Sequence, residues 1–368
     1  MPKKACSFCG RSENEVKLLI TGINGFICEE CAKQAFEIVQ QTGVLNPKGD
    51  DAKFALKQVP KPVEIKEYLD EYIIGQEHAK RHLAVAVYNH YKRLQQPEDK
   101  EGVEIEKSNI IMVGSTGTGK TLLARTIAKL LDVPFTIVDA TVFTEAGYVG
   151  EDVESILSRL LQVADYNVEA AQRGIVFIDE IDKIAGRRGG SGPDVSREGV
   201  QRDILPIVEG STVNTKYGPV KTDYMLFIAA GAFHVAKVSD LIPELQGRFP
   251  VHVQLKSLTR EDFQRILTQP DNALTLQYKA LMAVDKVMLT FEDSAIEAIA
   301  NAAFTANETA EDIGARRLHA VFEQVLEDIS FNAGDENMPP FELTINGEYV
   351  QQHLSGENKP TDLRKYIL

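Results

Sequence analysis

A glycine-rich segment of the sequence has the residue types and spacing needed to hold phosphate groups. Gly114-Ser-Thr-Gly-Thr-Gly-Lys120-Thr121 matches the pattern G-x-x-x-x-G-K-[ST]. It follows the apolar run Ile110–Val113 and precedes a helical pattern at Leu122–Leu131, which is the strand–loop–helix context of a phosphate loop rather than of a simple turn. We expect backbone N–H groups to bind phosphate oxygens, Lys120 to reach the β- and γ-phosphates, and Thr121 to bind Mg²⁺.

Two carboxylates follow a second apolar run. Ile175–Ile178 reads as a strand buried on both faces, and Asp179 and Glu180 stand at its carboxyl end, where open α/β sheets bind ligands. We expect Asp179 to hold the magnesium shell and Glu180 to orient and polarise the attacking water. A pair that merely caps the next turn is the minor alternative once a phosphate loop is present. The two motifs together predict nucleotide triphosphate hydrolysis, but not the work that it drives.

The four cysteines have the spacing of a structural zinc site. Cys6 and Cys9 form one C-x2-C pair, and Cys28 and Cys31 form a second pair after 18 intervening residues. Asn24-Gly25 favours a hairpin turn that would bring the second pair back to the first. So small a module needs the metal for its folding energy, and a closed set of four thiolates implies no zinc catalysis. Four unrelated reduced cysteines are the weaker alternative.

Composition limits the class of protein. The chain has 368 residues, an ordinary apolar content and a net charge of −14, which argues against a primary role on nucleic acid. No apolar run has the length of a membrane span, and residues 1–6 contain no signal-peptide core. These features, with cysteines clustered as metal ligands, predict a cytoplasmic protein.

The elements that must position these motifs alternate along the middle of the chain. Short apolar runs, including Phe135–Val138 and Leu226–Ala229, alternate with helical patterns and predict a parallel sheet with helices on its faces. After residue 256 the pattern is mainly helical, interrupted by a β-like piece at Phe341–Ile345. We therefore expect an α/β protein with a zinc-binding module at 1–41, a linker at 42–62, a large ATPase domain at 63–255 and a small, mainly helical domain at 256–368.

Further motifs make the family specific. The chain contains Tyr72-Ile-Ile-Gly-Gln76, Gly147-Tyr-Val-Gly150, Pro243-Glu-Leu-Gln-Gly-Arg248 and Gly314-Ala-Arg-Arg-Leu318. With the phosphate loop, this set resembles the Clp family of AAA+ unfoldases. Residues 1 to about 185 resemble ClpX, including its zinc module, whereas residues from about 187 to 368 resemble HslU, the ATPase of the HslUV protease. The large helical insertion that HslU carries before its carboxylate strand is absent here.

The resemblance implies roles for individual residues. Arg248 is similar to the arginine finger that reaches the nucleotide of the neighbouring subunit, and Glu244 lies in the same interface segment. Arg316 is similar to the second sensor. Without the resemblance, a surface ion pair would be the preferred interpretation of either arginine. The implied nucleotide-binding set is Ile74, Gly114, Gly117, Thr118, Gly119, Lys120, Thr121, Leu122, Asp179, Glu244 and Arg316.

The same resemblance implies a pore loop and a protease partner. Tyr148 and Val149 correspond to the loop that grips the substrate chain, with Tyr148 as its aromatic residue. The tail 363–368 is similar to the HslU tail that inserts into HslV. The path from Phe233 to Leu245 lacks the Ile-Gly-Phe loop with which ClpX docks on ClpP, which disfavours ClpP as a partner. The strand Leu226–Gly231 also lacks a polar first sensor.

The resemblance thus implies an ATP-driven, homohexameric ring that unfolds proteins and threads them into a peptidase, with ATP, Mg²⁺ and Zn²⁺ as cofactors. The zinc module would recruit substrates or adaptors. Two alternatives stay open. One is an AAA+ remodeller of nucleic-acid complexes, which the charge disfavours. The other is a ClpX/HslU-like hybrid that does not assemble, because the two sides of each subunit interface come from different families and do not match.

Overall fold

The computed structural model describes residues 5–22, 25–41, 59–96, 105–143, 153–186, 195–333 and 341–355. The chain divides into two compact units, Met1–Leu56 and Lys57–Leu368. In the first unit, β1 (Leu19–Thr21) and β2 (Phe26–Cys28) form the antiparallel hairpin that the sequence predicts. The 3-10 helix η1 (Glu13–Glu15) precedes them and α1 (Glu29–Gln41) follows.

A five-stranded parallel sheet forms the centre of the second unit. Its order is β4-β5-β8-β3-β9, and every neighbouring pair is parallel. The predicted parallel sheet is therefore confirmed, with one strand more than the sequence indicated, because β9 was not expected. The strands are β3 (Ile110–Val113), β4 (Phe135–Asp139), β5 (Ile175–Asp179), β8 (Leu226–Gly231) and β9 (Val251–Gln254).

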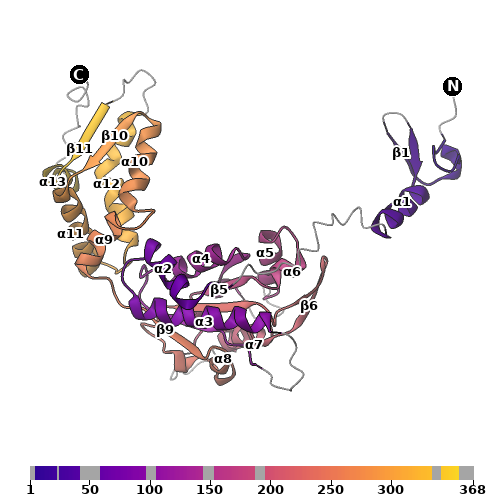
Figure 1. Cartoon of the computed structure of the whole chain (residues 1–368), viewed down its shortest axis with the longest axis horizontal. Helices are drawn as coiled ribbons and strands as arrows, with labels where there is room; N and C mark the ends of the chain where they lie inside the picture. Colours follow the sequence, from indigo (N-terminus) through magenta and orange to yellow (C-terminus); the bar gives the residue numbers. More distant parts are fainter. Residues whose placement is uncertain are drawn as a thin grey trace. The chain divides into compact units, whose positions relative to one another are not determined.

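Helices pack on this sheet because its strands are apolar on both sides. Helix α3 contacts β9 and helix α4 contacts β5 and β8 (Figure 1). Apolar residues of α5 and α7 join Ile111, Val176 and Ile178 in one continuous core. The helices of this part are α2 (Pro62–Tyr72), α3 (Glu77–Gln95), α4 (Lys120–Leu131), α5 (Ser155–Val163), α6 (Val168–Ala171), α7 (Val195–Glu209) and α8 (Pro243–Arg248), with 3-10 helices η2 (Ala140–Val142), η3 (Ile181–Lys183) and η4 (Val238–Asp240).

A separate hairpin stands beside the sheet. Strands β6 (Thr212–Thr215) and β7 (Gly218–Lys221) pair antiparallel with each other, with Val213 opposite Val220. Val220 is fully buried and belongs to the same core as α5 and α7. One face of the hairpin is thereby anchored, and this element was not predicted from the sequence.

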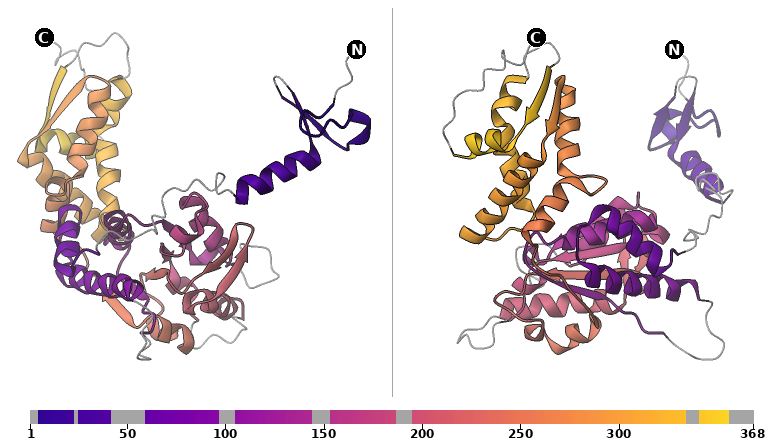
Figure 2. Two further views of the ribbon diagram at one scale, coloured as in Figure 1. Left: turned by 45° about the vertical axis from the view of Figure 1, so that its right-hand side comes forward. Right: turned by 60° about the vertical axis from the view of Figure 1, so that its left-hand side comes forward.

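The C-terminal elements share a second core. Strands β10 and β11 pair in parallel, with Val287 opposite Phe341, and helices pack against them (the orange and yellow elements in Figure 2). The predicted strand Phe341–Ile345 is confirmed, whereas β10 and the last helix were not predicted. The elements are α9 (Arg260–Thr268), α10 (Leu274–Val284), β10 (Val287–Phe291), α11 (Asp293–Thr309), α12 (Arg316–Ala333), β11 (Phe341–Ile345) and α13 (Gly347–Leu354). Within the described ranges, no helix is both long and apolar enough to span a bilayer.

Candidate functional site

The phosphate loop joins β3 to α4 and has the backbone geometry that its glycines allow. Gly117 and Gly119 have φ values of 73° and 102°, in the left-handed region that side chains other than glycine rarely adopt. Helix α4 begins at Lys120, so its N-terminus points its free N–H groups at the loop. Lys120 is buried, and its Nζ donates to the carbonyl oxygens of Gly114 (2.5 Å) and Ser115 (2.9 Å). The ammonium is therefore held inside the loop.

The loop is pressed against the segment that precedes α12. The N–H of Ala315 donates to the carbonyl of Gly117 (3.1 Å). A Cβ placed on Gly117 would lie 1.9 Å from the carbonyl oxygen of Ile313, so only glycine fits there. Gly314 also has a positive φ, of 55°. This contact brings the start of α12, and with it Arg316, to the phosphate loop.

The end of β5 supplies the acidic part of the site. Burial raises the pKa of Asp179, while the backbone N–H of Glu180, Lys120 and Arg316 oppose that rise. Burial likewise lowers the pKa of Lys120, and Asp179 and Asp182 oppose that fall. Lys120 and Asp179 therefore each favour the charged form of the other, against the effect of burial. Glu180 is exposed and has a left-handed φ of 55°, at the sharp turn into η3.

These groups line one cavity of about 670 Å³. It is large enough for a nucleotide, and its lining brings the buried ammonium of Lys120 together with several carboxylates and the guanidinium of Arg316. A triphosphate with Mg²⁺ fits this donor set, because the loop and Lys120 offer N–H donors to phosphate and Asp179 offers oxygen to a hard cation. Of the predicted site residues, Gly117, Gly119, Lys120, Thr121, Leu122, Asp179, Glu180 and Arg316 line the cavity.

Three other predicted residues lie beside the cavity without lining it. Ile74 is buried, Gly114 lies against Leu255, and the Thr118 hydroxyl donates to the carbonyl of Ser115 (2.8 Å). Tyr72, two residues before Ile74, lines the cavity instead. The role predicted for Ile74 against the base stays a prediction.

The opposite wall of the cavity was missed by sequence reasoning. The N–H of Asp271 donates to the carbonyl of Glu71 (2.9 Å), which holds the α9–α10 connection next to the end of α2. Only Tyr72 belongs to a motif, Tyr72-Ile-Ile-Gly-Gln76, and the other members are ordinary apolar and amide side chains. They are Tyr72, Ile266, Pro270, Asn272, Leu274 and Gln277.

Arg248 and Glu244 lie outside this cavity, on the short helix α8. Arg248 forms an ion pair with Glu209 at the end of α7, and both side chains are partly exposed. Its backbone carbonyl accepts a hydrogen bond from Asn109 Nδ2 (2.9 Å). Arg248 therefore does not take part in the cavity of its own chain, and its predicted role at the nucleotide of a neighbouring subunit stays a prediction.

Two polar side chains join the turn after Glu180 to its neighbours, Gln201 to the segment that leads to α8 and Asp182 to the end of β8. Gln201 on α7 is buried; its Nε2 donates to the carbonyl of Ile184 (2.6 Å) and its Oε1 accepts from the N–H of Ile242 (2.8 Å). Asp182 accepts from the N–H groups of Ala232 and Phe233 (3.3 and 3.2 Å). The β8 end, which lacks a polar first sensor, is therefore held by a carboxylate from η3.

In the first unit, the four cysteine sulfurs converge. One ligand atom from each of Cys6, Cys9, Cys28 and Cys31 lies within 4.8 Å of the others. Burial raises the pKa of Cys6, but backbone N–H donors outweigh it and lower the value to about 6, whereas burial raises the pKa of Cys31 to about 12. Four thiols this close cannot all ionise without a cation between them, so the set fits a four-thiolate zinc site.

Removing zinc should unfold the first unit without unfolding the ATPase unit. The full chain with Cys9→Ser should lose bound zinc and the hydrogen-exchange protection of residues 25–41, because metal binding supplies the folding energy of so small a unit. Zinc content and hydrogen exchange on the full chain test this, with Glu13→Gln, an exposed position of the same unit, as the control. Retained protection in zinc-free protein would contradict the assignment.

Two predicted features fall outside the described residues: Tyr148 and Val149 of the predicted pore loop, and the tail 363–368. Their roles stay predictions.

Comparisons with known proteins place both units in described families. Residues 4–41 match the ClpX C4-type zinc finger, and residues 105–252 match the AAA domain of the Cdc48 subfamily. The AAA fold predicted for the ATPase unit, with its ATP and Mg²⁺, and the zinc-binding module are therefore confirmed.

Whole-chain relatives fall into two groups. The ATP-dependent Clp protease ATP-binding subunit ClpX of Bacteroides thetaiotaomicron is 50% identical, covering 97% of this chain and 97% of the relative, and that of Porphyromonas gingivalis is 44% identical over 95% and 96%. The ATP-dependent protease ATPase subunit HslU of Caldicellulosiruptor saccharolyticus is 40% identical over 83% of this chain and 99% of its own length. The predicted division into a ClpX-like and an HslU-like half is supported only in part, because the similarity to ClpX spans nearly the whole chain.

Proposed function

Because the chain belongs to the ClpX family of AAA ATPases, we propose that it hydrolyses ATP to unfold proteins and delivers them to a separate peptidase. It is an ATP hydrolase of the ClpX type, and its sequence is similar to those of the Clp protease ATP-binding subunit ClpX and of the protease ATPase subunit HslU. The single observation that carries the proposal is the cavity in which Lys120, Asp179 and Arg316 meet, with Glu180 at its edge.

Within this site we propose the following division of work. Lys120 and the loop N–H groups hold the phosphates, Asp179 holds Mg²⁺, and Glu180 orients the attacking water. Bound Mg²⁺ would neutralise charge on the phosphates. Arg316 senses the nucleotide in its own subunit, and its link to Gly117 through the 313–315 backbone supports this role.

We propose that the second unit consists of a large domain, residues 63–255, and a small domain, residues 256–368, that hinge about the nucleotide. Two observations support this: the sheet and the C-terminal elements have separate cores, and the cavity is lined from both. A homohexameric ring in which Arg248 completes the neighbouring site, and Tyr148 and Val149 grip the substrate in the pore, would turn hydrolysis into pulling. We also propose a cytoplasmic location, since free thiols as metal ligands suit a reducing compartment.

The peptidase partner that we propose is of the HslV type. The segment from Phe233 to Leu245 consists of a turn, η4 and the start of α8, with no room for a docking loop in this stretch. The ClpX relative aligns over 410 positions, more than the 368 residues of this chain, so it carries insertions that this chain lacks. The HslU-like tail 363–368 supplies the proposed docking contact.

A degradation assay tests both parts of this proposal. A folded, tagged fluorescent reporter is incubated with the full chain and ATP, together with an HslV-type peptidase, a ClpP-type peptidase or neither. Loss of reporter only with the HslV-type peptidase would support the full proposal, and loss only with the ClpP-type peptidase would overturn the partner but retain the unfoldase. A chain that hydrolyses ATP without unfolding the reporter, and whose ATPase is stimulated by DNA, would instead favour a nucleic-acid remodeller.

A further inference from the structure

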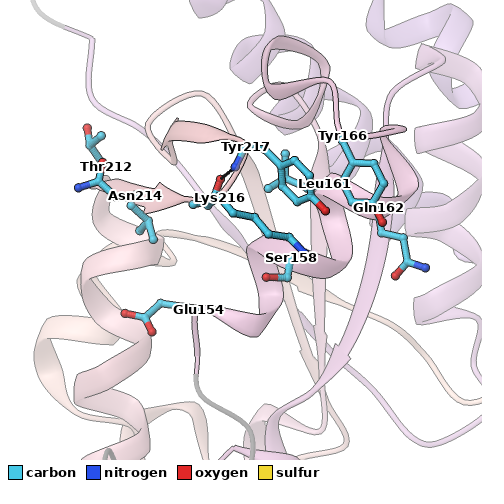
Figure 3. Close-up of a pocket in the computed structure, with 11 residues that line it drawn as sticks. Glu154, Ser158, Leu161, Gln162, Tyr166, Thr212, Asn214, Lys216 and Tyr217 are labelled. Carbon is cyan, nitrogen blue, oxygen red and sulfur yellow. Dashed lines mark hydrogen bonds between the residues drawn. The ribbon is translucent and has the colours of Figure 1, made fainter. Parts of the chain in front are cut away.

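A second cavity, of about 800 Å³, lies between helix α5 and the β6–β7 hairpin, away from the nucleotide site. Figure 3 shows Glu154 and Ser158 on one side of it and strand residues Thr212 and Asn214 on the other. Tyr166 and Tyr217 stack at one end, with ring centroids 4.4 Å apart. The cavity is therefore a groove with a helix as one wall, a strand edge as the other and an aromatic pair at its end.

The strand wall has free backbone groups. The N–H of Thr222 donates inward to the carbonyl of Ser211 (2.9 Å), while the N–H of Lys221 points outward and donates to Gln172 Oε1 (2.8 Å). With this register, the alternation of an antiparallel ladder turns the N–H and C=O groups of Thr212 and Asn214 to the outer edge of β6. Within the described ranges, the N–H and C=O groups of Thr212 and Asn214 have no hydrogen-bond partner.

The two edges of the hairpin differ in how their outward backbone groups are protected. On β7, the outward position opposite Asn214 is Pro219, which has no N–H, and Gln172 covers the next one. Proteins commonly protect exposed strand edges in these ways. On β6 nothing comparable protects the edge within the described ranges, and the cavity runs along all four of its residues, Thr212–Thr215. An edge left open beside a groove matches the donor and acceptor spacing of an extended peptide backbone.

The side chains around the groove can accommodate bound peptides of varied sequence. Tyr166 and Tyr217 are both partly exposed and offer broad aromatic faces. The Lys216 side chain extends across the groove toward Ser158, and its Nζ lies 4.9 Å from the centre of the Tyr217 ring (Figure 3). Leu161 and Gln162 complete the helix wall. Apolar, amide and charged side chains can all find a contact here.

We propose that this groove binds an extended segment of unfolded polypeptide as a third strand on β6. The occupant is a stretch of the protein substrate, so the inference rests on the proposed function and gives it a holding site outside the nucleotide cavity. Backbone hydrogen bonds from Thr212 and Asn214 would supply sequence-tolerant affinity, and the tyrosine pair would hold one side chain of the bound segment.

Asn214→Pro tests the edge directly. It removes an outward N–H and leaves every inward bond of the hairpin possible, whereas the matched Asn214→Ala keeps the N–H and removes only the side chain. The full chain is titrated, in the presence of a slowly hydrolysed ATP analogue, against fluorescent carboxymethylated lactalbumin, a permanently unfolded chain. We expect Asn214→Pro to weaken binding about tenfold and Asn214→Ala to change it by less than about twofold.

A second variant works from the other wall, so the test does not depend on the hairpin tolerating proline. Ser158→Trp fills the groove from the exposed side of α5 and should weaken binding as Asn214→Pro does, while Ser158→Ala should not. Unchanged binding in Ser158→Trp and in a folded Asn214→Pro protein would overturn the proposal. A change in oligomeric state without a change in binding would assign the edge to a second copy of the chain and equally overturn it.

Basal ATPase activity separates this inference from the proposed function. Both variants should hydrolyse ATP at the wild-type rate, because neither residue belongs to the nucleotide site. If the wild-type protein binds the unfolded chain through β6 but fails to unfold a folded reporter, the result would support the groove as a binding site and contradict the unfoldase function.

Discussion

Replacing Glu180 by glutamine is expected to stop ATP turnover while leaving ATP binding intact. Glutamine has nearly the same shape but cannot accept a proton from water, and a positioned general base contributes about 100-fold to 10,000-fold to a rate. Glu180 is exposed and lines the cavity, and within the described ranges its side chain has no hydrogen-bond or ion-pair partner, so its replacement should not disturb the fold. The phosphate contacts that we propose for Lys120 and the loop are unchanged in this variant.

Steady-state ATPase rates and ATP affinity, measured on the full chain, check this result. We expect turnover to fall at least about 100-fold and the dissociation constant for ATP to change less than about threefold. Glu308→Gln, an exposed carboxylate on α11, is the control and should behave as wild type. Unchanged turnover would remove Glu180 from its role, and lost ATP binding would make it a structural residue instead.

The elements that could be predicted from the sequence are those whose signals are local. The runs Ile110–Val113 and Phe341–Ile345 are strands with the expected bounds, because each is a short β-prone segment between clear breaks. The paired cysteines and the phosphate loop were equally clear, since their chemistry demands fixed spacing. In each of these cases, residues that are close together in the sequence are enough to predict the structure.

The missed elements depend on distant partners. Strand β9 has only four residues, Val251–Gln254, and is defined by its pairing with β3, about 140 residues earlier in the chain. β10 likewise pairs with β11 across the helices α11 and α12. Short strands of this kind cannot be told from loops or helix ends without knowledge of their partners.

The site shows the same limit. The phosphate-binding half was predictable, but the wall formed by Ile266, Asn272 and Gln277 was not, because contacts between distant segments, such as the hydrogen bond from Asp271 to Glu71, bring it to the cavity. The buried amide of Gln201, which bridges Ile184 and Ile242, carries no sequence motif either. It nevertheless connects the turn after Glu180 to the helix that carries Arg248.

Arg248 should act on the nucleotide of the adjoining subunit, and variants mixed in one ring can show this. Arg248→Ala is expected to lower turnover at least about 1,000-fold if the arginine stabilises the transferring phosphate. The competing interpretation is that Arg248 only pairs with Glu209 on the surface, a contact worth about 0–1 kcal/mol. Glu209→Gln breaks that pair and keeps the arginine, so it should retain activity if the catalytic interpretation is right.

Mixing Arg248→Ala with Glu180→Gln gives the decisive measurement. Each variant alone is inactive, but a site that combines the Glu180 of one subunit with the Arg248 of its neighbour is complete. Random assembly of equal amounts in a closed ring makes about one quarter of the sites complete, so activity should return in the mixture. A mixture as inactive as its components would show that Arg248 does not act between subunits. A chain that stays monomeric with ATP would show that the ring interface does not form.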